Sequence, residues 1–333
     1  MGHPSKLLAV AALALTAGAC GGASDEVGGT EDASGGGTKL SLVAYSVAKV
    51  GYDRVIPLYE QTPQGEGTAF SESYGASGDQ SRKVASGLPA DLVSFSLAPD
   101  VTRLVENGQV DPDWNRRGVP FGSVVTIVVR KGNPKHITTW DDLLEPGVEV
   151  VTPNPFSSGS AKWNLLAPYA EKSEGGRDPE AGLAYLAKLI GEHVKVQPKS
   201  GREATETFNQ GTGDALLTYE NEALFDERNG DPVEHHTPPA TFKIENPVAV
   251  LKTGEHPKEA QAFLDFLYTP EAQKGFAEAG FRPVDEAVAK QFDFPAPEKL
   301  YTIDDLGGWA KVDDELFDPD DGTVARIYNQ TTN

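Results

Sequence analysis

The run Val124-Val125-Thr126-Ile127-Val128-Val129 is the most informative part of this sequence for the fold. Its residues are apolar and β-branched almost throughout, which is typical of a strand that is buried on both faces of a sheet. A second apolar run, Pro247-Val248-Ala249-Val250-Leu251, follows much later in the chain and is its expected return partner. We therefore expect the chain to cross between two lobes at these runs.

Outward from these runs, short apolar segments alternate with helical patterns. This alternation predicts an α/β protein with mostly parallel sheets and helices on their faces. The expected strands are residues 40–45, 68–74, 91–95, 148–152, 194–197 and 215–218, and the expected helices are 46–62, 81–87, 257–268 and 270–279.

The two crossings divide the chain into lobes with a ligand cleft between them. Lobe one takes residues 39–123 and 245–333, and lobe two takes residues 124–244. The alternative is a single large α/β domain, which would contain the same strands but no hinge.

The N-terminal residues predict export. Lys6 is followed by an uncharged apolar run over residues 7–19, which suits a signal peptide and is too short to span a membrane. The small residues of Ala17-Gly18-Ala19-Cys20 resemble the bacterial lipobox, although Ala17 stands where that motif usually has Leu. We expect residues 1–19 to be a signal peptide and Cys20 to be lipidated, which anchors the protein to the outer face of the cell membrane. The alternative is an ordinary cleavage site beside an incidental cysteine.

The remaining composition narrows the classes of partner. Cys20 is the only cysteine, so no disulfide forms within the chain, and residues 20–38 are a Gly/Ser/acidic linker that cannot form a core. The formal net charge is −21, and loss of residues 1–19, which contain Lys6 and no acidic residue, makes it −22. This balance argues against nucleic acid as a partner. An acidic protein should also repel an anionic ligand, so a binding site for an anion would need local groups that outweigh this repulsion.

Serine and glycine gather in turns where expected strands lead into helices. These turns are Gly75-Ala76-Ser77-Gly78-Asp79, Pro153-Asn154-Pro155-Phe156-Ser157-Ser158-Gly159-Ser160-Ala161 and Lys199-Ser200-Gly201-Arg202. The first N–H groups of a helix have no partner within the helix, and the helix dipole adds positive potential there, so such a turn can bind an anion. Taken singly, each turn is equally well explained as a helix cap.

The segment Pro153-Asn154-Pro155-Phe156-Ser157-Ser158-Gly159-Ser160-Ala161-Lys162-Trp163-Asn164 closely resembles the periplasmic sulfate- and thiosulfate-binding proteins, the substrate-binding components of ABC importers. The resemblance runs collinearly from about Leu40 to about Leu316. It also includes Arg130-Lys131-Gly132-Asn133-Pro134-Lys135, Gly213-Asp214, Glu220-Asn221-Glu222-Ala223-Leu224, Phe281-Arg282-Pro283 and Gly307-Gly308-Trp309-Ala310.

This resemblance implies a two-lobed, type II periplasmic-binding-protein fold that closes over dehydrated sulfate and delivers it to the permease subunits of the importer. The family binds the ion with backbone N–H groups, a serine hydroxyl and an indole N–H. Because these donors are neutral dipoles, an acidic surface does not exclude an anion. We expect a monomeric receptor with no cofactor, no metal and no enzymatic activity. The implied ligand contacts are Ser46, Ser77, Ser158, Gly159, Ser160, Gly201, Arg202 and Tyr219.

Three positions depart from the family pattern. Ser46 stands in place of an aspartate, Tyr219 in place of the indole donor, and the turn at Gly201 and Arg202 is one residue shorter. An indole can only donate a hydrogen bond, whereas a phenol can donate or accept one. A phenol therefore tolerates a protonated anion such as hydrogen phosphate, and thiosulfate, molybdate and phosphate stay open as alternative ligands.

Other signals favour different functions less strongly. His235-His236 with Asp231 and Glu234 lack the ligand spacing of a known zinc motif, so we expect a solvated loop. Gly75-Ala76-Ser77-Gly78-Asp79 lacks the final glycine of a nucleophile elbow. A polyamine or ferric-ion receptor of the same fold would need carboxylates in the cleft, where the Ser-Gly turns lie. A signalling receptor without transport would share the same pocket.

Overall fold

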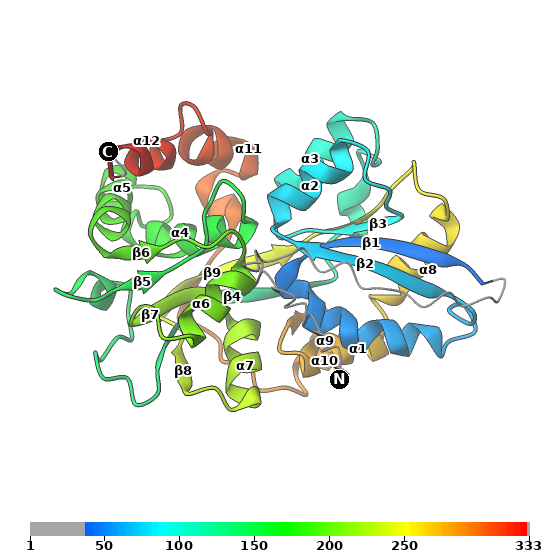
Figure 1. The fold of residues 1–333 in the computed structure, drawn as a ribbon, viewed down its shortest axis with the longest axis horizontal. Helices are drawn as coiled ribbons and strands as arrows, with labels where there is room; N and C mark the ends of the chain where they lie inside the picture. The colour runs from blue at the N-terminus through cyan, green and yellow to red at the C-terminus, as the bar shows by residue number, and fades with distance from the viewer. Residues whose placement is uncertain (1–36, 332–333) are drawn as a thin grey trace, which may run out of the picture.

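The structure is a computed structural model that describes residues 37–331, so the expected signal peptide and Cys20 lie outside the described residues. Two α/β lobes lie side by side, one built on a four-stranded sheet and the other on an eight-stranded sheet (Figure 1). The predicted two-lobed α/β fold is confirmed.

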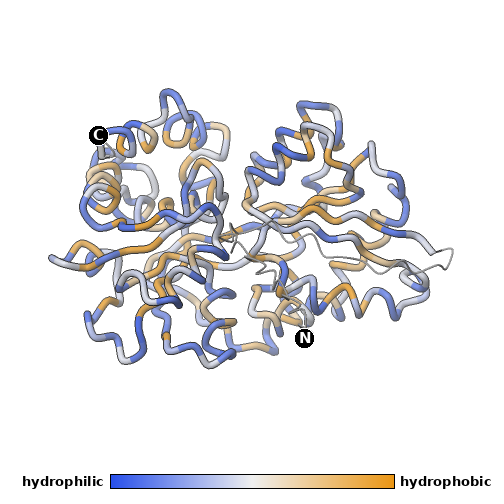
Figure 2. Tube along the Cα trace, viewed as in Figure 1, coloured by the Kyte–Doolittle hydropathy of each residue, from blue (hydrophilic) through white to orange (hydrophobic). Residues whose placement is uncertain are grey.

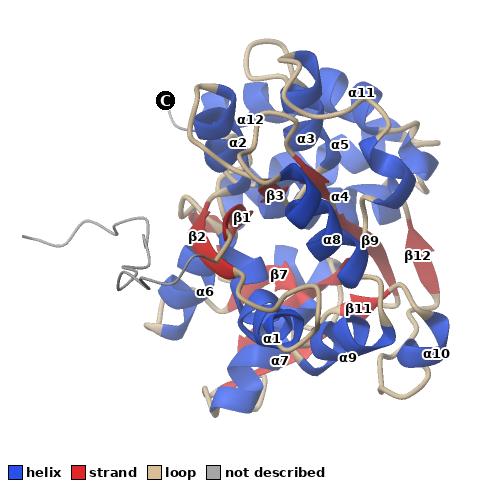
Figure 3. Cartoon of the chain, turned by 90° about the vertical axis from the view of Figure 1, so that its right-hand side faces the viewer, coloured by secondary structure: helices blue, strands red, loops and turns tan. Residues whose placement is uncertain are grey.

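Lobe one has helices on both faces of its sheet (Figure 3). The strand order is β10-β3-β1-β2, with β1, β2 and β3 parallel to one another and β10 antiparallel to β3. Its strands are β1 (Lys39–Tyr45), β2 (Ala69–Gly75), β3 (Leu92–Ser94) and β10 (Val248–Val250). Its helices are η1 (Ser46–Ala48), α1 (Lys49–Glu60), α2 (Ser77–Ala85), α3 (Ala98–Glu106), α8 (Pro257–Phe266), α9 (Pro270–Glu278) and α10 (Glu286–Ala289).

Lobe two is built on a mixed sheet of order β12-β9-β4-β7-β5-β6, in which β4 also pairs with β8 and β11. Its strands are β4 (Phe121–Arg130), β5 (Val150–Val151), β6 (Val194–Val196), β7 (Ala215–Tyr219), β8 (Val233–His236), β9 (Ala240–Asn246), β11 (Arg282–Pro283) and β12 (Lys299–Tyr301). Its main helices are α4 (Gly159–Lys172), α5 (Pro179–Lys188), α6 (Gly201–Asn209), α7 (Glu220–Asn229), α11 (Trp309–Val312) and α12 (Thr323–Thr331). Shorter turns of helix in this lobe are η3 (Asp141–Leu144), η4 (Leu189–His193), η5 (Ile303–Leu306) and η6 (Asp313–Phe317), whereas η2 (Trp114–Arg117) packs against β10 of lobe one.

The crossing strand β4 contains the apolar run that predicted it, and that run is fully buried. Its antiparallel partner is β9, not the run at 247–251, which forms β10 and pairs with β3 in lobe one. Pro247 separates β9 from β10 because proline has no N–H to continue a ladder. Its carbonyl accepts from Phe95 N at 2.9 Å, and Val248 N donates to Gly118 O at 2.8 Å. The two crossings therefore lie side by side and form a hinge.

The C-terminal segment lies in a different place from the one expected. Residues 245–333 are expected in lobe one. Strand β10 and helices α8 and α9 do lie there, but β12 pairs with β9 of the large sheet, and the end of the described chain lies beside α5 (Figure 1). Aromatic contacts explain this packing. Trp309 packs edge-on against Trp163 of α4 with ring centroids 4.7 Å apart, and Tyr328 packs against Phe156 at 5.8 Å.

Apolar residues concentrate along the strands and on the inner helix faces (Figure 2). The start of β4 is held in lobe one by an aromatic cluster, in which Phe121 stacks on Phe276 of α9 at 4.2 Å and also contacts Phe281. Within residues 37–331, no helix combines the length and apolarity that crossing a bilayer would require.

Candidate anion-binding site

Three parallel strands of each lobe end where the lobes face each other, and each leads into the first turn of a helix. Contacts across the lobes join these ends. Trp163 Nε1 of α4 donates to Ser96 O at 2.9 Å, and Gly78 N of α2 donates to Ser157 O at 3.1 Å. Lys199 Nζ lies 3.0 Å from Asp79 Oδ2. The described arrangement is therefore a closed one, in which the helix N-termini converge.

Among these turns, the N-terminus of α4 is the strongest candidate for an anion site. Ser158 occupies the N-cap position with an extended backbone, but its side chain caps no N–H group, and the first turn contains no acidic residue. Gly159, Ser160 and Ala161 are all buried there. Ser158 Oγ lies 2.7 Å from Ser160 Oγ. Only one of the two hydroxyl hydrogens can lie between these oxygens, so the other can be donated to a different group. The turn thus presents neutral donors at the positive end of a helix dipole.

Two glycines allow the close approach of the elements around this turn. A Cβ atom at Gly159 would lie 2.7 Å from the side chain of Ser96 in lobe one. A Cβ atom at Gly201, the first residue of α6, would lie 2.8 Å from Ser160 Oγ and 3.0 Å from Val47, the residue after Ser46. The structure therefore brings together Gly201, Ser160 and the turn at Ser46, as expected for a shared site.

Ser77 and Arg202 lie beside the site, but their side chains already have partners. Ser77 Oγ donates to Asp100 Oδ2 at 2.6 Å and accepts from Ser96 N at 2.9 Å. Helix α2 begins at Ser77 rather than at the expected residue 81, because the first helical hydrogen bond already joins Gln80 N to Ala76 O. Arg202 Nη2 donates to the buried Glu222 at 2.8 Å. The hydroxyl of Ser77 thus positions Ser96, and Arg202 neutralises a carboxylate.

Tyr219 is fully buried at the N-cap of α7, and its hydroxyl lies 2.6 Å from Ser96 Oγ. Burial raises the pKa of Tyr219 far above its ordinary value, so the phenol keeps its proton. Sequence reasoning missed Ser96 because its turn contains no glycine. The available signal was Ser96 at the end of a strand and Pro99 in the first turn of the next helix.

Buried carboxylates behind the site are paired with arginines. Arg282 binds Glu220 with two hydrogen bonds of 2.7 and 2.8 Å, and Arg202 binds Glu222. These two glutamates are therefore each balanced by a neighbouring guanidinium. No group of three His, Cys, Asp or Glu side chains suited to a metal ion occurs in the described part of the chain.

Asp226 of α7 gives stability a pH dependence. Burial, followed by the nearby Glu222, raises the pKa of Asp226 from 3.8 to about 7. Between about pH 4 and pH 7 the folded protein therefore holds a proton that the unfolded chain has lost, so this residue makes stability fall as pH rises through that window. Between pH 5 and pH 8 the melting temperature of the wild type should fall. That of the Asp226→Asn variant, which has no carboxyl group to titrate at this position, should fall by several degrees less. Calorimetry at both values tests this, and parallel changes in the two proteins would contradict it.

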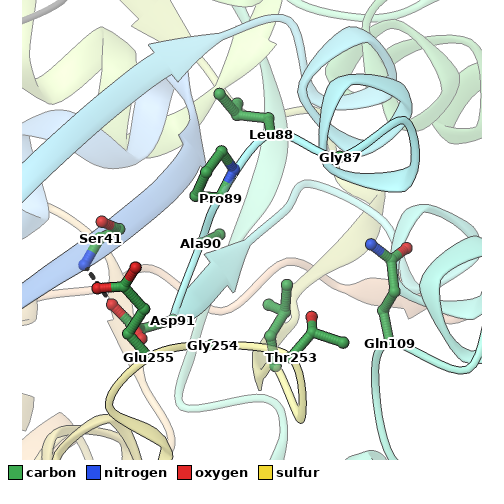
Figure 4. A pocket seen from close by; sticks show the side chains of 11 residues that line it. Ser41, Gly87, Leu88, Pro89, Ala90, Asp91, Gln109, Thr253, Gly254 and Glu255 are labelled. Atoms are coloured by element: carbon green, nitrogen blue, oxygen red, sulfur yellow. Dashed lines mark hydrogen bonds between the residues drawn. The ribbon is translucent and has the colours of Figure 1, made fainter.

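Two cavities lie near surface turns. The one of about 400 Å³ in Figure 4 lies at the amino end of the lobe-one strands, opposite the site. Its buried carboxylate, Asp91, already accepts from Ser41 N and His256 N, each at 2.8 Å. A second cavity of about 280 Å³ lies between the lobes against Ser158 and Gly159. Only the second cavity borders the α4 N-terminus.

Comparison with known proteins places this geometry in a family. The family described as "Bacterial extracellular solute-binding protein" matches residues 41–282. The sulfate-binding protein of Synechococcus elongatus is 38% identical over 320 residues, which cover 92% of this chain and 90% of that protein. The thiosulfate-binding protein of Pseudomonas aeruginosa is 34% identical, with 87% and 92% covered.

Among solved structures, the sulfate-binding protein SubI from Mycobacterium tuberculosis H37Rv superposes with a TM-score of 0.83 at 60% identity. The match covers 84% of this chain and 100% of that one. The resemblance carried by residues 153–164 is thus confirmed over most of the chain. The chain belongs to the bacterial extracellular solute-binding proteins, in the family of the sulfate-binding proteins.

Proposed function

We propose that this chain is an extracytoplasmic receptor that captures sulfate between its lobes and delivers it to an ABC-type importer. The observation that carries the proposal is the buried N-terminus of α4, where no side chain caps the helix and two serine hydroxyls adjoin the first turn. The names of the relatives, sulfate- and thiosulfate-binding proteins, agree with this chemistry. The receptor acts in transport and not as an enzyme.

The ion is held by hydrogen bonds from neutral groups. The donors are the N–H groups of Gly159, Ser160 and Gly201, the backbone at Ser46, and hydroxyls of the Ser158–Ser160 and Ser96–Tyr219 pairs. A hydrogen bond to a charged group contributes roughly 1.5–3 kcal/mol net, and micromolar affinity needs about 8 kcal/mol. Several aligned donors are therefore sufficient.

The net charge of −21 does not oppose this binding. Surface charges are screened beyond about 8–10 Å at physiological salt, whereas the donors lie within hydrogen-bonding distance of the ion. The buried acids near the site, Asp100, Glu220 and Glu222, are each paired with an arginine. That pairing disfavours a polyamine or ferric-ion receptor, which would need available carboxylates.

Calorimetry of the mature chain tests the function. Sulfate should bind with micromolar affinity or better, thiosulfate, molybdate and hydrogen phosphate more weakly, and spermidine not at all. Tight binding of spermidine with no binding of any oxyanion would overturn the proposal.

Lipid anchoring through Cys20 and a monomeric state belong to the same proposal. Both faces of the cleft come from one chain, so a monomer suffices for capture. The lipobox-like Ala17-Gly18-Ala19-Cys20 supports the anchor. The Cys20→Ser variant should appear in the medium or stay unprocessed, while the Ala17→Leu control, which restores the usual residue, should stay with the membrane. Membrane fractionation checks this. A Cys20→Ser protein that is cleaved normally and still found with the membrane would rule out the anchor.

A further inference from the structure

Ser96 joins lobe one to two elements of lobe two. Within the turn from β3 to α3 it is fully buried, and all its polar groups have partners. Its N–H donates to Ser77 Oγ at 2.9 Å, its carbonyl accepts from Trp163 Nε1 at 2.9 Å, and its Oγ lies 2.6 Å from the hydroxyl of Tyr219. The Ser96 hydroxyl therefore has a fixed position at the closed interface.

That position is next to the proposed anion. A Cβ atom at Gly159 would lie 2.7 Å from Ser96 Oγ, so the hydroxyl borders the first residue of α4. Ser77 also fixes the Ser96 backbone, because it accepts from the Ser96 N–H while donating to Asp100. The Ser96 hydroxyl therefore adjoins both the phenol of Tyr219 and the first residue of α4.

The hydrogens of the pair follow from its chemistry. Burial raises the pKa of Tyr219, so both groups are neutral hydroxyls. One hydroxyl donates to the other, and the accepting oxygen keeps its own hydrogen and one further lone pair. The pair therefore keeps a donor and an acceptor for its other neighbours, which are the buried Asn246 side chain beside Tyr219 and a bound anion, whereas an indole offers a donor alone.

We propose that Ser96 is a specificity-determining residue of the sulfate site, and that with Tyr219 it forms one hydroxyl unit that donates to sulfate and also accepts from a protonated oxyanion such as hydrogen phosphate. This inference rests on the proposed function. Ser96 lies outside the three Ser-Gly turns found in the sequence. The preference for one anion over another would then depend on Ser96 and Tyr219 together.

Calorimetry with sulfate and with hydrogen phosphate tests the pair. Ser96→Ala should weaken sulfate binding by about 10- to 150-fold, the effect of losing one hydrogen bond to a charged group. Ser96→Cys, which puts a somewhat larger and only weakly donating thiol in place of the hydroxyl, should lose a similar factor. The double variant Ser96→Ala/Tyr219→Phe should bind about as weakly as the weaker single variant. If the double variant lost affinity by the product of the two single losses, Ser96 and Tyr219 would act independently, and the proposal of one hydroxyl unit would be wrong.

A second double variant tests the preference for sulfate over hydrogen phosphate, which would not change if Ser96 had only a structural role. Tyr219→Trp alone crowds Ser96, and Ser96→Ala makes room for the ring. The double variant Ser96→Ala/Tyr219→Trp should therefore bind sulfate and raise its preference over hydrogen phosphate at least about tenfold, the value of one hydrogen bond. An unchanged preference would overturn the role in specificity.

Ser94→Ala is the matched control, because it removes a buried hydroxyl two residues earlier in the same region, and its affinity should equal that of the wild type. The outcomes separate the two proposals. A wild-type protein that binds no oxyanion refutes the proposed function together with this inference. A wild type that binds sulfate, with Ser96→Ala and Ser96→Cys binding equally well, refutes the inference alone.

Discussion

Gly159→Ala should weaken sulfate binding by at least about 100-fold, because the new methyl group holds the lobes apart. Its Cβ would lie 2.7 Å from the side chain of Ser96 and 2.8 Å from Leu97 Cγ, closer than carbon atoms approach without displacement. Gly159 is the first residue of α4, and Ser96 and Leu97 belong to lobe one, so the collision falls on the closing interface. Losing two or three charge-assisted hydrogen bonds accounts for a factor of that size. Calorimetry with sulfate measures it.

The control for this variant is Gly275→Ala in α9. Its Cβ would lie 3.2 Å from Leu58 and Val55, both within lobe one, so the same added methyl crowds a single lobe and not the interface. This control should leave sulfate affinity within a few-fold of the wild type, because any change in thermal stability arises within lobe one. Equal affinity losses in both variants would mean that Gly159 acts through stability, contrary to the account.

Ser158→Ala should lower sulfate affinity by about 10- to 150-fold, the value of one hydrogen bond to a charged group. An N-cap serine replaced by alanine ordinarily costs roughly 0.5–2 kcal/mol of stability. Here the Ser158 side chain caps no N–H group and contacts Ser160 Oγ instead. The free protein should therefore melt close to the wild-type temperature, and the loss should fall on binding.

Thr269→Ala supplies the opposite control. Thr269 caps α9 by accepting from Ala272 N, far from the cleft, so its removal should lower stability and spare affinity. Calorimetry and thermal unfolding of both variants measure the contrast. Sulfate affinity unchanged in Ser158→Ala would remove that hydroxyl from the site.

The order of strands and helices could be predicted because its signals are local. The buried run in β4 and the Ser-Gly turn before α4 depend on residues close together in sequence. The pairing of β4 with β9, and the packing of β12 on lobe two, depend on contacts between distant segments. Trp309 reaches Trp163 only in the folded protein. No periodicity in the sequence reports that contact.

The site was predictable to the same extent. The Ser-Gly turns marked helix starts, and the family resemblance implied Gly159, Ser160 and Gly201 as ligand contacts. The structure places Gly201 against Ser160. The side-chain partners were not predictable. Glu222 lies far from Arg202 in sequence but accepts a hydrogen bond from its guanidinium. Asp100 likewise accepts a hydrogen bond from the distant Ser77 hydroxyl. Such pairings set which groups stay available for an anion, and they depend on tertiary structure.

In the proposed complex the anion lies at the N-terminus of α4, between the lobes, and is held by neutral donors. A crystal of the mature chain grown with selenate, a tetrahedral oxyanion of the same charge as sulfate, would locate the ion by the anomalous signal of selenium. We expect a strong peak within hydrogen-bonding distance of the Gly159 and Ser160 N–H groups and of Ser96 Oγ. A peak found only against surface lysine or arginine side chains, with none between the lobes, would contradict it.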